Sequence, residues 1–585
     1  MIMKKYKSIK RYSTMVLTII LFSLGACEDS LEIDVRDSFA SDLVLSTPEQ
    51  VELLLLTTYN STESFGAGSQ FWARYMNVEI ASFEARMNFN AATQALDRFN
   101  VVRGWTSANV GQLGQKWQDL WTYVRQANVF LELVEESEAQ QNNPDEIEAL
   151  KAEMRFLRAN QYSKLLKFYG GVPLLTSAAT LDDDFNIPRN SYQEVVEFIV
   201  SEIDEIAPLL PLTRDSGEFG RATRLAALAL KSRTLLYAAS DLHDPAMAPQ
   251  SSNLELYTYD KPNKWQDAAD AAAAVIDLVG DRDLISTPNA KAYQELFLSA
   301  NQDILFARPF GGTVFGFGTD VTTQPDNAQS PRGFDGWGLS TPLHNYTMIY
   351  NMEDGNTTES PSFDAANPYE NREMRFYANI NYQGAVFRGR PIDYSISVDN
   401  TVVPDGLDSF SQDQQTLGNF RHGSTTGYAM RKFQNEALGT DVKQASPGRP
   451  YIIYRLAEIY LNYAEASYRA GDEETARRYV SRVSERALQP AITASGPELL
   501  EAIKRERRVE LAFEGHNFFD ERRWLNEDNL GFDVKGLRWS KDLNENVSFE
   551  EFTIETRPFD QKQYYLPIPQ SEINRTEALV QNEGY

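Results

Sequence analysis

Residues 454–487, YRLAEIYLNYAEASYRAGDEETARRYVSRVSERA, decide the fold class of this chain. In the first half of this stretch Tyr460, Ala464 and Tyr468 recur four residues apart. This spacing places small and aromatic side chains on one face of an α-helix. Gly471 then ends that helix, and the same kind of pattern resumes directly after it. The stretch therefore predicts a hairpin of two antiparallel helices.

The same helical periodicity extends through much of the chain. Further helices are expected over residues 48–59, 117–131, 143–169, 191–210, 222–239, 265–279 and 497–524. The hairpin at 454–487 has the small and aromatic positions of one tetratricopeptide unit, but no strict 34-residue repeat is visible elsewhere. We therefore predict a mainly α fold of tetratricopeptide-like helical hairpins, most of them degenerate.

The sequence changes in character between residues 301 and 448. Glycine, proline, asparagine and aromatic residues dominate there, and only short runs at 303–307, 375–381 and 428–433 have the composition of strands. Long irregular stretches inside a compact protein are usually functional. This region is expected to be a loop-rich, partly β insertion between helical hairpins.

The N-terminal segment predicts export and anchoring. Residues 1–26 combine five basic residues with an apolar run that is too short to span a bilayer, and the small residues Gly25 and Ala26 precede Cys27. This arrangement is typical of a lipoprotein signal peptide, with Cys27 as the lipidated residue held in membrane lipid; the alternative is an ordinary signal peptide with a chance cysteine. Residues 27–42 are acidic and weakly patterned, as expected of a tether.

Composition excludes several classes of chemistry. Cys27 is the only cysteine, so the rest of the chain has no disulfide, thiolate nucleophile or cysteine-based zinc site. The formal charge is −27, and removal of residues 1–26 would bring it to about −32. Such a charge argues against nucleic acid as a partner, because nucleic-acid binding requires clustered lysine and arginine.

No catalytic motif stands out. The four histidines, His243, His344, His422 and His516, are far apart and form no HExxH pair. Glu510 and Glu514 lie one helical turn apart, as a carboxylate pair might, but they sit among Arg505, Arg507, Arg508, Arg522 and Arg523. Ion pairing explains them better than acid–base catalysis. We expect no enzyme activity, with a glycoside hydrolase as the distant alternative, and no cofactor, while a structural calcium stays open.

Three C-terminal segments resemble the SusD/RagB family. They are residues 454–466 (YRLAEIYLNYAEA), residues 505–524 (RERRVELAFEG running to DERRW), and the closing YLPIP at 565–569 with QNEGY at 581–585. Shorter matches occur at 169–173, 352–355, 371–375 and 426–428. Each motif is weak alone, but their order along the chain is highly specific.

The resemblance implies a non-catalytic lipoprotein of the Bacteroidetes outer membrane, exposed at the cell surface. Such proteins capture oligosaccharides, or peptides in the RagB branch, and deliver them to a partner SusC-like TonB-dependent transporter. We expect a signal peptide at 1–26, a tether at 27–42, an N-terminal SusD-like helical region at 43–280 and a C-terminal RagB/SusD region at 281–585, packed as one unit. An oligosaccharide is the expected ligand, and a peptide is the alternative.

Aromatic residues in irregular segments are the candidates for ligand contact. A glycan site needs exposed aromatic planes flanked by polar groups, because sugar rings present both C–H faces and hydroxyl edges. Trp117, Trp121, Trp265, Trp524 and Trp539 fall in patterns that favour packing. The remaining tryptophans and their neighbours form the predicted ligand site: Trp72 with Arg74 and Tyr75, Trp105 with Asn109, and Trp337 with Asp335.

Overall fold

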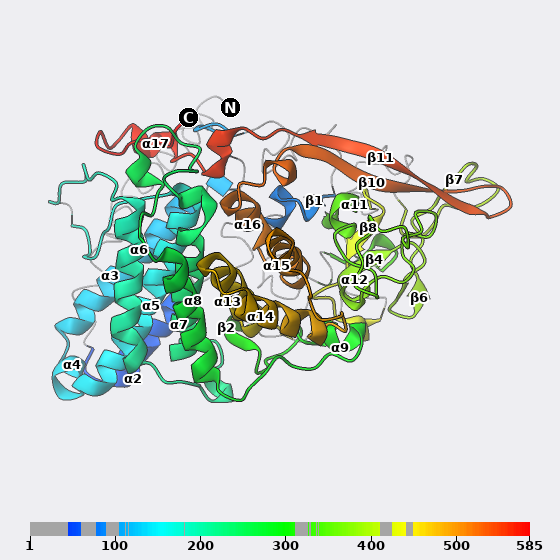
Figure 1. The fold of residues 1–585 in the computed structure, drawn as a ribbon. Coiled ribbons are helices and arrows are strands. Elements are labelled where there is room, and N and C mark those ends of the chain that lie inside the picture. The colour runs from blue at the N-terminus through cyan, green and yellow to red at the C-terminus, as the bar shows by residue number, and fades with distance from the viewer. Residues whose placement is uncertain are drawn as a thin grey trace, which may run out of the picture.

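The computed structural model shows helices at one side of the molecule and short strands with a long two-stranded ribbon at the other (Figure 1). The structure describes residues 45–59, 78–88, 105–110, 113–114, 116–180, 182–309, 326, 329–334, 336, 338–409, 424–439 and 448–585. Among these residues no helix combines the length and the apolar character needed to cross a bilayer.

The helical side is a row in which each helix packs on the next. Its members are α2 (Pro48–Tyr59), α3 (Lys116–Glu135), α4 (Glu138–Asn142), α5 (Pro144–Tyr169), α6 (Tyr192–Ile206), α7 (Arg224–Ala239), α8 (Lys264–Val279), α13 (Leu456–Ala470) and α14 (Glu473–Arg486). Helix α3 packs on α5, α5 on α6, α6 on α7, and α7 on α8. Helix α13 then packs on both α8 and α14, so the hairpin quoted above continues a row that starts in the N-terminal half.

Local sequence explains how these helices begin and pack. Ser191 caps α6 with a complete capping box, in which its side chain and that of Glu194 each accept a hydrogen bond from the other's backbone N–H. On α7, Ala226 and Ala229 are fully buried, which lets neighbouring helices approach closely. Gly471 has φ +96°, a left-handed conformation that ends α13 at little cost for glycine.

The strands form small sheets, mostly pairs. Antiparallel pairs join β1 (Ala85–Met87) to β3 (Ser340–Pro342), β2 (Ile304–Pro309) to β9 (Pro450–Arg455), β4 (Ile380–Tyr382) to β8 (Tyr428–Met430) and β5 (Val386–Phe387) to β6 (Arg390–Pro391). The longest strands, β10 (Phe532–Lys541) and β11 (Val547–Arg557), form an antiparallel ribbon, and β7 (Ile396–Ser397) pairs in parallel with β10. This ribbon, red and orange in Figure 1, extends away from the helical row.

The other described helices lie outside this row. They are α9 (Ala290–Glu295), α11 (His344–Thr347), α12 (Met374–Asn379), α15 (Pro497–Glu510), α16 (Asn517–Arg523) and α17 (Gln570–Ile573). Two expectations were wrong here. The run 375–381 is mostly helix α12 and becomes a strand only at β4. The helix expected over 497–524 breaks into α15 and α16, because Phe513 and Gly515 adopt positive φ values of 60° and 78° between them.

Candidate ligand site

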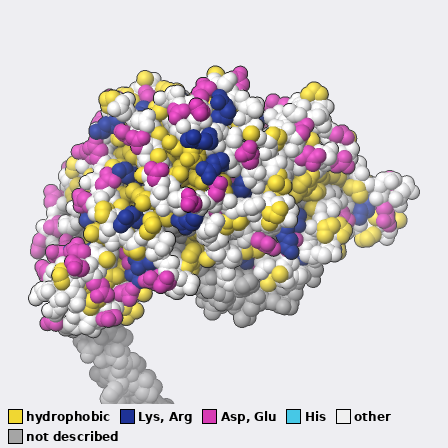
Figure 2. Space-filling model, turned by 60° about the horizontal axis from the view of Figure 1, so that its bottom comes forward, with side chains coloured by type: hydrophobic (Ala, Val, Ile, Leu, Met, Phe, Trp, Pro, Cys, Tyr) yellow, Lys and Arg dark blue, Asp and Glu magenta, His cyan; other side chains and the backbone are white. Residues whose placement is uncertain are grey.

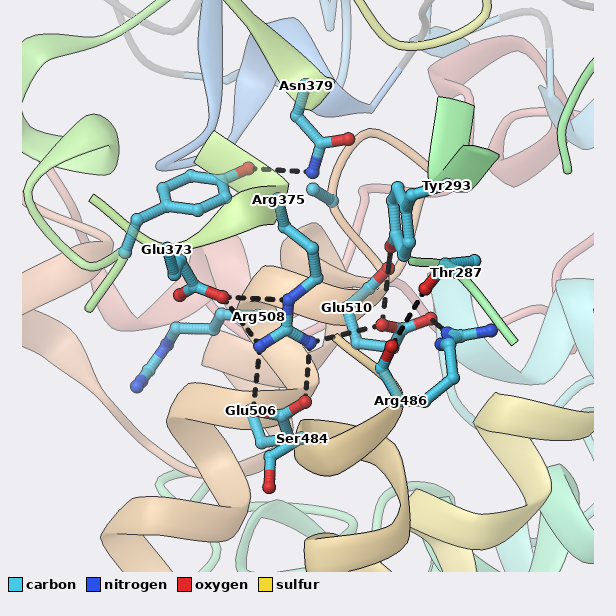
Figure 3. Close-up of polar contacts among 12 residues, drawn as sticks. Thr287, Tyr293, Glu373, Arg375, Asn379, Ser484, Arg486, Glu506, Arg508 and Glu510 are labelled. Carbon is cyan, nitrogen blue, oxygen red and sulfur yellow. Dashed lines mark hydrogen bonds and ion pairs between the residues drawn. The ribbon is translucent and has the colours of Figure 1, made fainter. Parts of the chain in front are cut away.

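Glu510, the strongest acid–base candidate in the sequence, is enclosed by arginines (Figure 3). Arg375 lies between Glu373, Glu506 and Glu510, with nitrogen–oxygen distances of 2.8, 2.5 and 3.1 Å. Glu510 also accepts hydrogen bonds from Arg455, at 2.6 Å, and from Arg486. Burial would raise the pKa of Glu510, but these guanidinium groups hold it far below its usual range. A carboxylate fixed in this way cannot take up a proton near neutral pH.

The prediction that Glu510 and Glu514 are ion-paired is confirmed, but their partners differ from those expected. Glu514 pairs with Lys432 at 2.7 Å and with Arg455 at 2.6 Å, both from segments distant in sequence. The arginines next to these acids in sequence face elsewhere, because adjacent helical residues point in different directions. Their observed partners are Asp520 for Arg507, Glu521 for Arg508, and Glu465 with Asp520 for Arg523. The arginines of this motif therefore join α15 to α16, and Arg523 joins α16 to α13.

The described histidines are also structural. Burial lowers the pKa of His243 to about 3 and that of His344 to about 4, and it holds the pKa of His516 well below its usual value. His243 stacks on Tyr192 with ring centroids 4.1 Å apart. In the described part of the chain no group of three or more His, Cys, Asp or Glu side chains is placed to hold a metal ion.

One hollow opens between α16 and the start of the β10–β11 ribbon, and we call it the α16 hollow. Its wall includes Trp105, Asn517, Phe518, Arg522, Arg557 and Phe559. Asn517 with Glu521, and Phe518 with Arg522, are spaced four residues apart, so one face of α16 supplies these side chains. The hollow thus combines aromatic surface with a guanidinium group and a side-chain amide. This is the mixture that a small-ligand site requires.

Acidic groups gather at the far end of the helical row, away from this hollow. Figure 2 shows Asp and Glu side chains gathered at the end of the molecule where the first helices of the row lie. Exposed carboxylates on or beside α2 to α5 include Glu49, Glu135, Glu136, Glu138, Asp145 and Glu146. Such a surface repels polyanions.

Comparison with known proteins identifies the family of this chain. The family described as "Starch-binding associating with outer membrane" matches residues 52–236, and the "SusD family" matches residues 303–585. A crystal structure of a SusD-like protein from Bacteroides fragilis superposes with a TM-score of 0.75 at 27% identity, covering 94% of this chain and 99% of that one. The chain belongs to the SusD family. The mainly α, tetratricopeptide-like fold predicted from the sequence is therefore confirmed.

Other relatives of this SusD-family protein agree. SusD-like protein P2 of Formosa agariphila is 24% identical over the full length of both chains. The starch-binding protein SusD of Bacteroides thetaiotaomicron is 26% identical over 80% of this chain and 78% of its own. A surface glycan-binding protein A of the same organism, in complex with laminarihexaose, shares the fold with a TM-score of 0.63 at 18% identity, covering 92% of this chain and 99% of that one. The family is one of carbohydrate-binding proteins.

The structure describes two of the predicted ligand residues in this SusD-family protein. Trp105 is only 2% exposed, so the expectation of an exposed aromatic plane was wrong. Its ring packs 6.2 Å from the Phe518 ring and 5.5 Å from the Arg522 guanidinium carbon, at the wall of the α16 hollow. Asn109 is exposed in a turn bridged to Thr106 and is not among the residues that line the hollow. A direct role for either in ligand contact stays a prediction.

The other predicted residues lie outside the described residues: Cys27, Trp72, Arg74, Tyr75, Asp335 and Trp337. By contrast, two of the tryptophans that the sequence assigned to packing do pack against aromatic rings. Trp117 packs 4.9 Å from Tyr169, and the Trp539 ring lies 4.8 Å from that of Phe549. Sequence reasoning missed Arg522, because an arginine beside Arg523 was taken as one more ion-paired residue.

Proposed function

We propose that this protein is a cell-surface lipoprotein, anchored through Cys27, that captures oligosaccharides and passes them to a SusC-like TonB-dependent transporter. The observation that carries the proposal is membership of the SusD family over both halves of the chain. Relatives support the ligand class, because one is a starch-binding protein and a structural neighbour holds laminarihexaose. The signal segment and Cys27 support the anchor and the outer-membrane location.

The chemistry of the described chain favours binding over catalysis. The acidic pair at Glu510 and Glu514 is neutralised by Arg375, Arg455, Arg486 and Lys432, and both acids are almost fully buried. A glycosidase needs two carboxyl groups that face its substrate, one of them able to donate a proton. We therefore expect capture without product release.

Isothermal titration with starch- and laminarin-derived oligosaccharides and with a peptide library tests the ligand class. We expect saturable binding of an oligosaccharide and no new reducing ends after prolonged incubation. Trp337→Ala should weaken this binding at least about tenfold, because a sugar ring stacked on tryptophan depends on that surface. Trp265→Ala, at the start of α8, serves as the tryptophan control. Binding of peptides alone would contradict the proposed ligand.

Anchoring and partnership need a cellular experiment. Cells that express the wild-type chain should incorporate labelled palmitate into it and should yield the transporter on affinity purification from outer membranes. Cys27→Ala should abolish the label and release the protein from the membrane fraction. Retention of Cys27→Ala in that fraction through washing at high salt would show that the proposed anchor is wrong.

A further inference from the structure

Arg522 differs from Arg507, Arg508 and Arg523, the other buried or nearly buried arginines of its motif, in having no acidic partner. Arg507, Arg508 and Arg523 each form an ion pair with a buried carboxylate at 2.5–2.7 Å. Arg522 is 5% exposed, yet in the described part of the chain it forms no ion pair. Its Nε donates to the Gln563 carbonyl oxygen at 3.1 Å, and its Nη1 donates to the Phe518 carbonyl oxygen at 2.8 Å. A buried guanidinium without a counter-ion is unfavourable, so the fold retains an uncompensated positive charge here.

That charge lies at the wall of the α16 hollow. The guanidinium of Arg522 stacks 3.7 Å from the Phe518 ring centroid, which fixes its plane, and within the described chain its Nη2 makes no hydrogen bond. Burial lowers the pKa of Arg522 to about 9, so it is still protonated at neutral pH. Arg557, which also lines the hollow, is paired with Glu555 at 3.1 Å, and Glu521, the acid on the same wall, is paired with Arg508. The hollow therefore has a local positive charge in a strongly acidic protein.

A second polar group in the same wall lacks a partner. Asn517 is 2% exposed, and its Nδ2 donates to the Glu521 carboxylate at 3.0 Å. Its Oδ1 is buried and accepts no hydrogen bond from the chain. Such an acceptor is costly to leave unsatisfied, so it calls for a donor from outside the chain. The wall thus lacks both an acceptor for Arg522 and a donor for Asn517.

The size of the hollow limits what can satisfy both groups. The space open to the centre of a water-sized probe is about 20 Å³, which corresponds to one or two water molecules. A sugar ring does not fit in this space, but a carboxylate group does. A planar carboxylate is the best match for a fixed guanidinium. A hydroxyl of the same molecule, on the next carbon in glycolate or on ring carbon 4 in a glucuronide, is the donor that the amide oxygen lacks.

We propose that the α16 hollow binds the carboxylate group of a hydroxy acid, with Arg522 as its cationic partner and Asn517 as acceptor for a hydroxyl of the same molecule. The carboxylate comes either from a free small hydroxy acid or from an acidic sugar residue whose ring stays outside the hollow. The inference goes beyond capture of oligosaccharides and does not depend on it.

Thermal-shift and calorimetric titrations of the full chain test this proposal. The probes are sodium glycolate, methyl glucuronide and, as neutral counterparts, ethylene glycol and methyl glucoside, all at one ionic strength fixed with sodium chloride. We expect a saturable increase in Tm with at least one of the two carboxylates and none with its neutral counterpart. A response to the glucuronide alone assigns the carboxylate to a sugar, and a response to glycolate assigns it to a free acid.

Variants then locate the binding. Arg522→Gln should raise the dissociation constant at least about tenfold, because a charge-assisted hydrogen bond is lost. Arg372→Gln is the matched control, since Arg372 is another buried arginine that donates only to backbone carbonyls, away from the hollow. Ala81→Leu provides an independent test, because Ala81 lines the hollow and a larger side chain would fill it.

Each outcome bears on the proposal. Equal stabilisation by carboxylates and neutral counterparts, or carboxylate binding that survives both Arg522→Gln and Ala81→Leu, would overturn it. Oligosaccharide binding without any carboxylate response would also overturn it while leaving the proposed function intact. Carboxylate binding without oligosaccharide binding would support it and refute the proposed function.

Discussion

Replacing Glu465 by glutamine should remove one of the strongest buried ion pairs in the molecule. Glu465 lies within α13 and is fully buried. Arg523 donates to both of its carboxylate oxygens, at 2.5 and 2.6 Å, and Trp524 Nε1 donates to one of them at 2.8 Å. Through this contact α16 is tied to the helical row, so the substitution tests whether the arginine-rich motif stabilises the assembly.

The expected loss follows from the pKa of Glu465. Burial would raise this pKa, but the Arg523 guanidinium outweighs burial and lowers it from 4.5 to about 2. Each unit corresponds to about 1.4 kcal/mol, so the charged form contributes about 3 kcal/mol to the free energy of unfolding. Breaking a buried ion pair by removing one partner costs a similar amount, about 3–5 kcal/mol. Glu465→Gln should therefore lower the free energy of unfolding by about 3 kcal/mol at pH 7.

Urea unfolding followed by circular dichroism measures this loss, and its pH dependence supplies a second test. Because the folded pKa is depressed, the contribution is fully present above pH about 4.5 and is lost as the pH falls toward 2. The difference between wild type and Glu465→Gln should thus shrink in acid. Glu550→Gln is the control, since its pair with Arg538, at 2.8 Å, is exposed and is expected to contribute about 0–1 kcal/mol. A loss below about 1 kcal/mol at pH 7, or one that does not change between pH 7 and pH 3, would refute the reasoning.

Further substitutions test the local structure. Gly171→Ala should lower the free energy of unfolding by at least about 2 kcal/mol, because the new Cβ would lie 2.9 Å from a backbone nitrogen at the start of α6. Gly280→Ala, with φ +67° and open space around it, should lower it by about 1 kcal/mol. Equal losses in urea unfolding would contradict this. Ser191→Ala removes the capping box of α6 and should lower the free energy of unfolding by about 1 kcal/mol. Ser201→Ala, at an exposed position on the same helix, should have little effect. Equal free energies of unfolding for the two variants would show that the cap is dispensable. Between pH 6.5 and pH 4.5 His243 takes up a proton only in the unfolded state, because burial lowers its folded pKa from 6.5 to about 3. This proton uptake should lower the free energy of unfolding of the wild type by about 1.4 kcal/mol per pH unit, and His243→Asn should remove that part of the pH dependence. Parallel pH profiles of the two proteins would contradict this.

Helices were predictable where one face is apolar and the ends carry their own signals. Residues 222–239 illustrate this, because the buried alanines and the Thr223 cap are both local features of the sequence. The break between α15 and α16 was not predicted, since it depends on two positive φ values that distant contacts hold in place. The β10–β11 ribbon was also missed. Its alternating pattern is present at 547–557, but the exposed side of the ribbon is too polar and too acidic to stand out as a strand.

The candidate site was less predictable than the fold. Trp105 was selected because it lies in an irregular segment beside Gly104 and polar residues, yet its ring is covered by Phe518 and Arg522 from a helix more than 400 residues away. Burial of this kind depends on tertiary packing, and no local pattern encodes it. The spacing of Asn517, Phe518 and Arg522 on one face of α16 was visible in the sequence. It became informative only once the ion-pair partners of the neighbouring arginines were known.

The arrangement of charge explains why the family was easier to find than the ligand. Arg507 and Arg508 on α15 pair with acids on α16, and Arg523 on α16 pairs with Glu465 on α13. Glu510 and Glu514 pair with Arg455 at the end of β9, so these charges constrain how the elements assemble. Removing one member of such a buried pair leaves a charge without a partner, so each member holds the others in place. A ligand site is under no such internal constraint, because its polar groups are completed by a molecule from outside the chain. Arg522 is the buried arginine of the motif that has no acidic partner in the described chain and lines the hollow, and for that reason we place the further ligand contact there.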